Sequence, residues 1–219
     1  MTFSSARRPS LMQKQKKRSV GLLGGSFNPA HDGHLTLSYQ CRNHFKLDQI
    51  WWLVSPQNPL KKQSGSADYA VKFQHAKRLT ARYPWLKIVD FEAVYGFSYS
   101  IDTITKLLAI YRKYRFIWLM GADNLKEFHQ WHQWQKIVMQ ITLGVYTRPY
   151  YDYGAISSPA ASYMQKWRMP EKYARTLQYK KAPSWCFIHA RCNAISSSQI
   201  RQSGLIKPLN KITHLNEPS

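Results

Sequence analysis

Two histidines, His31 and His34, stand three residues apart just after a glycine-rich turn, in the stretch GGSFNPAHDGHL (residues 24–35). Gly24 and Gly25 allow a ligand to approach the backbone closely. The helix expected to begin here would present unpaired N–H groups and a partial positive charge, which favour anions. The two imidazole rings add N–H donors at the same place. This combination predicts a site for the phosphates of a nucleoside triphosphate.

Other uses of these residues are open but less specific. A glycine turn after a strand is common, and the two histidines could simply lie at the surface. Zinc requires three or four ligands, and neither a cysteine, a glutamate nor a further histidine lies close by in sequence. The stretch is not a dinucleotide-binding G-x-G-x-x-G, and no Walker lysine follows the glycines.

A second cluster with similar chemistry lies near the carboxyl end, in AISSSQIR (194–201). Ser196, Ser197 and Ser198 would open a short helix, with Arg201 one turn further on. Their hydroxyls, the backbone N–H groups and the guanidinium would form a second phosphate cradle. A serine-capped helix alone is more often structural, but together with the first loop it supports nucleotide binding.

Both stretches resemble the signatures of a known superfamily. GGSFNPAHDGHL is similar to the G-x-F-x-P-x-H-x-G-H motif of the nucleotidyltransferases related to class I aminoacyl-tRNA synthetases, and AISSSQIR to their I-S-x-x-x-x-R motif. Over roughly residues 19 to 204 the chain resembles the bacterial nicotinate-nucleotide adenylyltransferases. The resemblance implies catalytic roles for His31, His34 and Arg201. For ATP binding it implies Gly24, Gly25, Ser26, Phe27, Asp123, Ser196, Ser197 and Ser198.

The same resemblance implies a binding site for the acceptor. Asn58 matches a family asparagine, and Lys61 or Lys62 stands where the family often has a histidine. FSYSIDT resembles the segment that reads the nicotinate carboxylate, with Thr103 a weaker candidate. Trp134 is expected in the core, while His129 and His132 are expected to be solvated or stacked. The acceptor-binding residues implied are therefore Asn58, Lys61, Tyr99, Ser100, Trp131 and Arg148.

The reaction implied is transfer of AMP from ATP to the 5′-phosphate of nicotinate mononucleotide, which yields nicotinate adenine dinucleotide and pyrophosphate. The second pKa of a phosphate monoester is about 6, so the attacking oxygen is already ionised at neutral pH. Positioning and electrostatic stabilisation would then supply most of the rate. Mg²⁺ is expected to bind mainly through the ATP phosphates, without a metal site in the protein.

The elements that must position these residues alternate along the chain as strands and helices. Strands that are apolar throughout indicate a parallel sheet buried on both faces. The fold class expected is α/β, a Rossmann-like parallel sheet with helices on both faces, of the nucleotidyltransferase type. Such sheets bind ligands beyond the carboxyl ends of their strands. We expect strands at 20–25, 49–55, 86–91, 115–121, 141–149 and 185–190, and helices at 34–45, 66–83, 100–114, 124–140 and 196–204.

The chain of 219 residues is long enough for a single domain. We expect this domain at 19–206, after a basic leader at 1–18 that contains six Lys and Arg and no acidic residue, and before a tail at 207–219. The leader is expected to be disordered, with a transit peptide as an alternative. Three cysteines without a C-x-x-C pair and the lack of a long apolar run indicate a cytoplasmic protein that does not enter a membrane.

The formal charge of +21 leaves a different class of function open. Such a charge attracts nucleotides, but it also suits a protein that binds RNA or DNA, and nonspecific nucleic-acid binding could coexist with catalysis. Within enzymes, phosphopantetheine adenylyltransferase shares an H-x-G-H and an I-S-S-S segment, and a preference for nicotinamide mononucleotide is a closer alternative. Neither the oligomeric state nor the role of the leader follows from the sequence.

Overall fold

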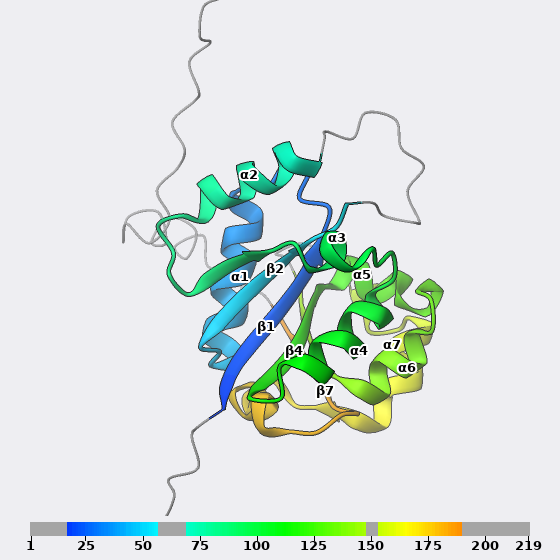
Figure 1. The fold of residues 1–219 in the computed structure, drawn as a ribbon. Helices are drawn as coiled ribbons and strands as arrows, with labels where there is room; N and C mark the ends of the chain where they lie inside the picture. Colours follow the sequence, from blue (N-terminus) through cyan, green and yellow to red (C-terminus); the bar gives the residue numbers. More distant parts are fainter. Residues whose placement is uncertain (1–16, 57–68, 148–152, 190–219) are drawn as a thin grey trace, which may run out of the picture.

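The computed structural model describes residues 17–56, 69–147 and 153–189. In these ranges seven strands form one sheet in the order β3-β2-β1-β4-β5-β7-β6, and every neighbouring pair is parallel (Figure 1). The predicted α/β fold is confirmed. The strands are β1 (Arg18–Gly25), β2 (Gln49–Val54), β3 (Leu86–Val89), β4 (Tyr114–Gly121), β5 (Thr142–Tyr146), β6 (Arg168–Met169) and β7 (Trp185–Ile188).

The centre of the sheet is apolar on both sides because helices cover both faces (Figure 1). On one face the sheet packs against α1 (Asp32–Phe45), α2 (Tyr69–Thr80) and the 3₁₀ helix η4 (Glu171–Tyr179). The other face packs against α3 (Phe91–Tyr95), α4 (Ser100–Ile110), α5 (Ala122–Glu127), α6 (Trp134–Gln140) and α7 (Pro159–Met164). Successive β1 residues divide between the two cores, as the alternation of a strand requires: Leu22 lies in one and Leu23 in the other.

The strand order reverses at β1, which lies between β2 and β4. The chain moves to one side of β1 through β2 and β3, and returns to its other side through β4. Loops that leave neighbouring strands in opposite directions open a crevice beyond the strand ends. The carboxyl ends of β1, β2 and β4 are therefore the expected place for a ligand.

Several predicted boundaries were wrong. The strand expected at 86–91 ends at Val89, because Asp90 begins α3. The helix expected at 124–140 is divided into α5, a 3₁₀ turn and α6. Its break lies at Trp131, which is extended, and Gln133, which has a left-handed backbone. The helix expected at 100–114 ends at Ile110, and β6, α7 and η4 were not predicted.

The rest of the predicted organisation is seen only in part. β1 begins at Arg18, the last residue of the predicted leader, while residues 1–16, the helix at 196–204 and the tail at 207–219 lie outside the described residues. Cys41 and Cys186 are buried free thiols. In the parts of the chain that are described, no helix combines the length and apolarity that a membrane span needs.

Candidate active site

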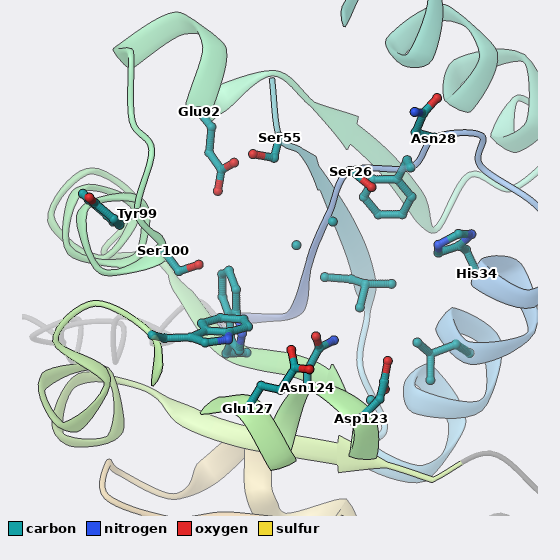
Figure 2. A pocket seen from close by; sticks show the side chains of 18 of the residues that line it. Ser26, Asn28, His34, Ser55, Glu92, Tyr99, Ser100, Asp123, Asn124 and Glu127 are labelled. Atoms are coloured by element: carbon teal, nitrogen blue, oxygen red, sulfur yellow. The ribbon is translucent and has the colours of Figure 1, made fainter. Parts of the chain in front are cut away.

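A cavity of about 930 Å³ lies at the carboxyl ends of β1, β2 and β4. The loop from β1 to α1 forms one wall, and the beginning of α4 and the residues after α5 form another. Figure 2 shows His34 reaching in from α1 and Asp123 from α5, with Glu92 and Ser55 facing each other at another end.

Ten of the predicted site residues line this one cavity, although they come from four separate segments of the chain. They are Gly24, Gly25, Ser26, Phe27, His31, His34, Tyr99, Ser100, Asp123 and Trp131. The other predicted residues lie outside the described parts of the chain: Asn58, Lys61, Arg148, Ser196, Ser197, Ser198 and Arg201.

The two histidines cap the helix that carries them. His31 is the N-cap of α1, and its Nδ1 accepts a hydrogen bond from the Gly33 N–H at 3.1 Å. The Nδ1 of His34 accepts from the His31 N–H at 3.2 Å, which completes a capping box. A Cβ on Gly33 would lie 2.8 Å from the His31 ring and would displace this ring from its capping position. Because each Nδ1 accepts a hydrogen bond, the neutral rings carry their proton on Nε2, which makes this N–H the donor group of each ring.

Phe27 lines the cavity beside the His34 ring and is almost entirely buried, with 2% of its surface exposed. Its ring stacks on Trp52 at a centroid distance of 4.7 Å and lies 5.0 Å from the His34 ring. The Trp52 indole N–H donates to Ser38 Oγ at 2.7 Å, and the Ser38 hydroxyl donates to the His34 carbonyl at 2.8 Å. Phe27 and Trp52 thus pack against the His34 ring, and Trp52 is also joined to the His34 main chain through Ser38.

Gly24 allows the chain to pass close to the cavity wall. A Cβ at this position would lie 3.0 Å from the Trp118 ring, which also lines the cavity. The next carbonyl, that of Gly25, accepts from the Ser55 N–H at 3.0 Å and so joins the ends of β1 and β2.

Asp123 lies in the first turn of α5, directly after β4, and its side chain folds back over Gly121. A Cβ on Gly121 would collide with Asp123 Oδ1. The colliding atom is the free end of an exposed side chain, which can swing away. The missing side chain at Gly121 is therefore what permits this position of the carboxylate.

Gly121→Ala is accordingly expected to displace the Asp123 carboxylate while the fold persists. For the nucleoside triphosphate that the His31–His34 motif predicts, we expect the KM to rise about tenfold, as for other small misplacements of a positioning group. The midpoint of thermal unfolding should stay close to that of the unmodified protein. Steady-state kinetics on Gly121→Ala beside Asp123→Asn would measure this, and an unchanged KM in both variants would contradict a nucleotide contact by Asp123.

The first turn of α4 faces the cavity without a side-chain cap. Tyr99 is its N-cap residue, and its side chain makes no capping hydrogen bond. The first N–H groups of an α-helix have no partner within the helix, so this end suits a carboxylate or phosphate. Ser100 adds a hydroxyl beside them, and both residues line the cavity.

Aromatic rings surround the same end of the cavity. Trp131 is half-buried and meets Trp118 and Phe128 edge to face, at centroid distances of 6.3 and 5.3 Å. The exposed His132 lies against the Tyr99 ring at a centroid distance of 4.4 Å and a tilt of 33°, in agreement with the expectation that it is solvated or stacked. Trp134 packs partly buried against the core, also as expected.

Comparison with known proteins decides the family. Residues 22–203 match the cytidylyltransferase-like family. A relative from Rhizobium meliloti, named "probable nicotinate-nucleotide adenylyltransferase", is 40% identical over 185 residues, which are 84% of this chain and 98% of the relative. A relative of the same name from Roseobacter denitrificans is 42% identical and covered to 92%. The chain is a member of the nicotinate-nucleotide adenylyltransferase family.

Solved structures agree with the fold of this family. The nicotinic acid mononucleotide adenylyltransferase of Plasmodium falciparum, in its complex with NaAD, matches with a TM-score of 0.59 at 16% identity, over 84% of this chain and 83% of that chain. Its complex with APC gives a TM-score of 0.58.

The adenylyltransferase cavity also contains carboxyl groups that the motifs did not indicate. Asp123 was the only acidic residue predicted in the site, and Glu92 and Glu127 join it in the lining. Among the lining residues that the structure describes there is neither Lys nor Arg. The cations expected at Lys61, Arg148 and Arg201 all lie outside the described ranges. The described residues contain no group of three or more His, Cys, Asp or Glu arranged to hold a metal ion.

Glu92 is the most buried of these carboxyl groups, with 7% of its surface exposed. Burial raises the pKa of the Glu92 carboxyl above its ordinary value, while hydrogen bonds from Ser55 and Thr103 act in the opposite direction. Thr103 itself is fully buried and donates to Glu92 instead of lining the cavity, so the weaker expectation that it binds the acceptor is not supported. Glu92 was not predicted because it lies between the strand expected at 86–91 and the helix expected at 100–114, in a stretch that contains no motif.

Proposed function

We propose that this protein transfers the adenylyl group of ATP to nicotinate mononucleotide, forming nicotinate adenine dinucleotide and pyrophosphate. One observation carries the proposal: a single cavity brings the His31–His34 pair together with an uncapped helix start at Tyr99–Ser100 and the ring of Trp131. The first group suits the phosphates of the donor nucleotide. The second suits an acidic aromatic acceptor.

At the donor end, the Nε2–H groups of His31 and His34 would bind the α- and β-phosphates of magnesium-bound ATP, with Gly24, Gly25 and Ser26 beside them. Asp123 would accept a hydrogen bond from the ribose. Ser196, Ser197, Ser198 and Arg201 would bind the β- and γ-phosphates. Mg²⁺ would enter with the nucleotide and would be held mainly by phosphate oxygens and water, as is usual at triphosphates, where it would offset the negative charge.

At the acceptor end, the N–H groups of the first turn of α4 and the Ser100 hydroxyl would bind the nicotinate carboxylate. Trp131 would stack on the pyridine ring, since an aromatic face attracts an electron-poor ring and excludes water. Asn58 and Lys61 would bind the 5′-phosphate, with Arg148 at the rim.

The chemical step then needs neither a general base nor a covalent intermediate. An oxygen of the ionised acceptor phosphate attacks the α-phosphorus of ATP, and the bond from that phosphorus to the bridging oxygen breaks. Pyrophosphate leaves with the electron pair. The protein lowers the barrier by aligning two anions and by donating hydrogen bonds to the charge that accumulates on the leaving group.

An acceptor panel tests the proposal. Purified protein is incubated with ATP, Mg²⁺ and, in turn, nicotinate mononucleotide, nicotinamide mononucleotide or phosphopantetheine, and pyrophosphate release is measured. We expect the largest kcat/KM with nicotinate mononucleotide. Turnover with phosphopantetheine alone would overturn the assignment, as would salt-sensitive binding of nucleic acid without release of pyrophosphate from any acceptor.

A further inference from the structure

Glu92 joins three elements around the cavity through its side chain. Its carboxyl Oε1 accepts a hydrogen bond from Thr103 Oγ1 at 3.2 Å, and the Ser55 side chain donates a further hydrogen bond to the same carboxyl group. Glu92 lies in α3, Thr103 in α4, and Ser55 directly after β2. Figure 2 shows Ser55 and Glu92 facing each other beside the cavity. The carboxyl group is thus the common acceptor for the end of a strand and for a helix.

One of these partners belongs to a rigid part of the fold. The Ser55 N–H donates to the Gly25 carbonyl at 3.0 Å, and the Lys72 ammonium approaches the Ser55 carbonyl at 3.4 Å. Ser55 is therefore tied to the ends of β1 and β2 and to α2. Any group bonded to its hydroxyl is held relative to the central sheet.

The other partner belongs to the helix start that faces the cavity. Thr103 is fully buried, and its N–H donates to the Tyr99 carbonyl at 3.4 Å. This bond forms part of the first turn of α4, the turn that carries Ser100. A contact that fixes the Thr103 side chain therefore also fixes the orientation of the N–H groups in that turn.

The backbone of Glu92 closes the connection between the two helices. Its carbonyl accepts from the Gly96 and Phe97 N–H groups, where Gly96 has a left-handed backbone with φ of 67°. This turn ends α3 and directs residues 97–99 into α4. Glu92 thus determines where α4 begins through both its main chain and its side chain.

We propose that Glu92 is a positioning residue for the acceptor: through Thr103 and Ser55 it holds the first turn of α4 at the correct place against the sheet. The inference rests on the proposed function, which assigns that turn to the nicotinate carboxylate. Glu92 does not contact the reacting atoms in this scheme. An oxygen acceptor is what the network requires, so glutamine, which keeps a carbonyl oxygen at the same position, substitutes for it and alanine does not.

The experiment measures steady-state kinetics with both substrates for five variants. Glu92→Ala is expected to raise the KM for nicotinate mononucleotide by about tenfold or more, because the buried donors lose their partner and the helix start shifts. The KM for ATP should stay within about twofold, because Ser55 is joined to the histidine loop by a main-chain hydrogen bond to Gly25, which these substitutions leave in place. Glu92→Gln should recover most of the loss. Thr103→Val should raise the same KM by several-fold, and Thr103→Ser should restore it.

Thr105→Val is the matched control. Thr105 lies on the same helix, is exposed, and donates to Gln140 Oε1 at 2.9 Å, away from the cavity. Its removal should leave the KM for the acceptor unchanged. If Glu92→Ala does not fold, the pair Thr103→Val and Thr103→Ser gives the answer.

The outcomes separate this inference from the proposed function. If the unmodified protein forms no dinucleotide from nicotinate mononucleotide, the proposed function fails. If it does, an unchanged acceptor KM in Glu92→Ala or Thr103→Val overturns the positioning role. An equal rise of both KM values, or a loss of kcat alone that follows the fraction of unfolded protein, also overturns it.

Discussion

Replacement of His34 by alanine is expected to lower kcat by on the order of 10²-fold or more, the usual cost of removing one preorganised donor to the transition state. The Nδ1 of His34 accepts a hydrogen bond from the His31 N–H, so Nε2–H is the ring's donor group. In the proposed mechanism it donates to the pyrophosphate as negative charge accumulates there. Pyrophosphate release under saturating substrates measures the change. Turnover close to that of the unmodified protein would remove His34 from its assigned role.

A control on the same helix separates this chemistry from loss of helix stability. His44 lies ten residues further along α1, about 15 Å away at the rise of an α-helix, and does not line the cavity. His44→Ala should keep kcat within about twofold. His34→Ala also removes half of the capping box, so its unfolding free energy should be measured alongside; losing a cap costs about 0.5–2 kcal/mol.

Phe27→Ala is expected to have the largest effect on stability. The ring is buried against Trp52 and supports His34, and large-to-small changes of a buried phenylalanine typically cost about 3–5 kcal/mol. The left-handed backbone of Phe27, with φ of 46°, is strained for alanine as well, so the substitution brings no compensating relief.

Urea unfolding followed by tryptophan fluorescence would measure this loss. Phe27→Leu, which keeps much of the apolar volume, should cost clearly less. A loss below about 1 kcal/mol in Phe27→Ala would mean that the ring is not the support that its stacking indicates.

The fold could be predicted because its strands are short, apolar throughout and separated by helical segments. Boundaries failed where local geometry is unusual. The start of α1 was placed two residues late, since histidine is not a common capping residue, and the break around Gln133 leaves no glycine or proline in the sequence to mark it. The helix expected at 100–114 ran on into β4 for a related reason, as neither Tyr111 nor its neighbours interrupt the pattern.

The candidate site could be predicted where its residues form contiguous motifs, as His31 and His34 do. Glu92, Ser55 and Glu127 escaped because each comes from a different segment, and the strand order alone brings them to one cavity. A carboxyl group whose two hydroxyl partners come from separate segments forms no motif of fixed spacing in the sequence. In the structure, the hydrogen bond from the Thr103 hydroxyl to the Glu92 carboxyl group identifies it.

The capping box at the start of α1 gives a reason for histidine at the anion site that we propose. Lysine and arginine are more familiar ligands of phosphate, but they have no lone pair with which to receive a hydrogen bond, so either one would leave the first turn of the helix open. In the proposed site imidazole serves both sides at once, with Nδ1 accepting from the backbone and Nε2–H donating to the nucleotide. The spacing of H-x-G-H is therefore the spacing that a capping box at a helix N-terminus requires. The motif serves the stability of α1 as well as the proposed contact with phosphate.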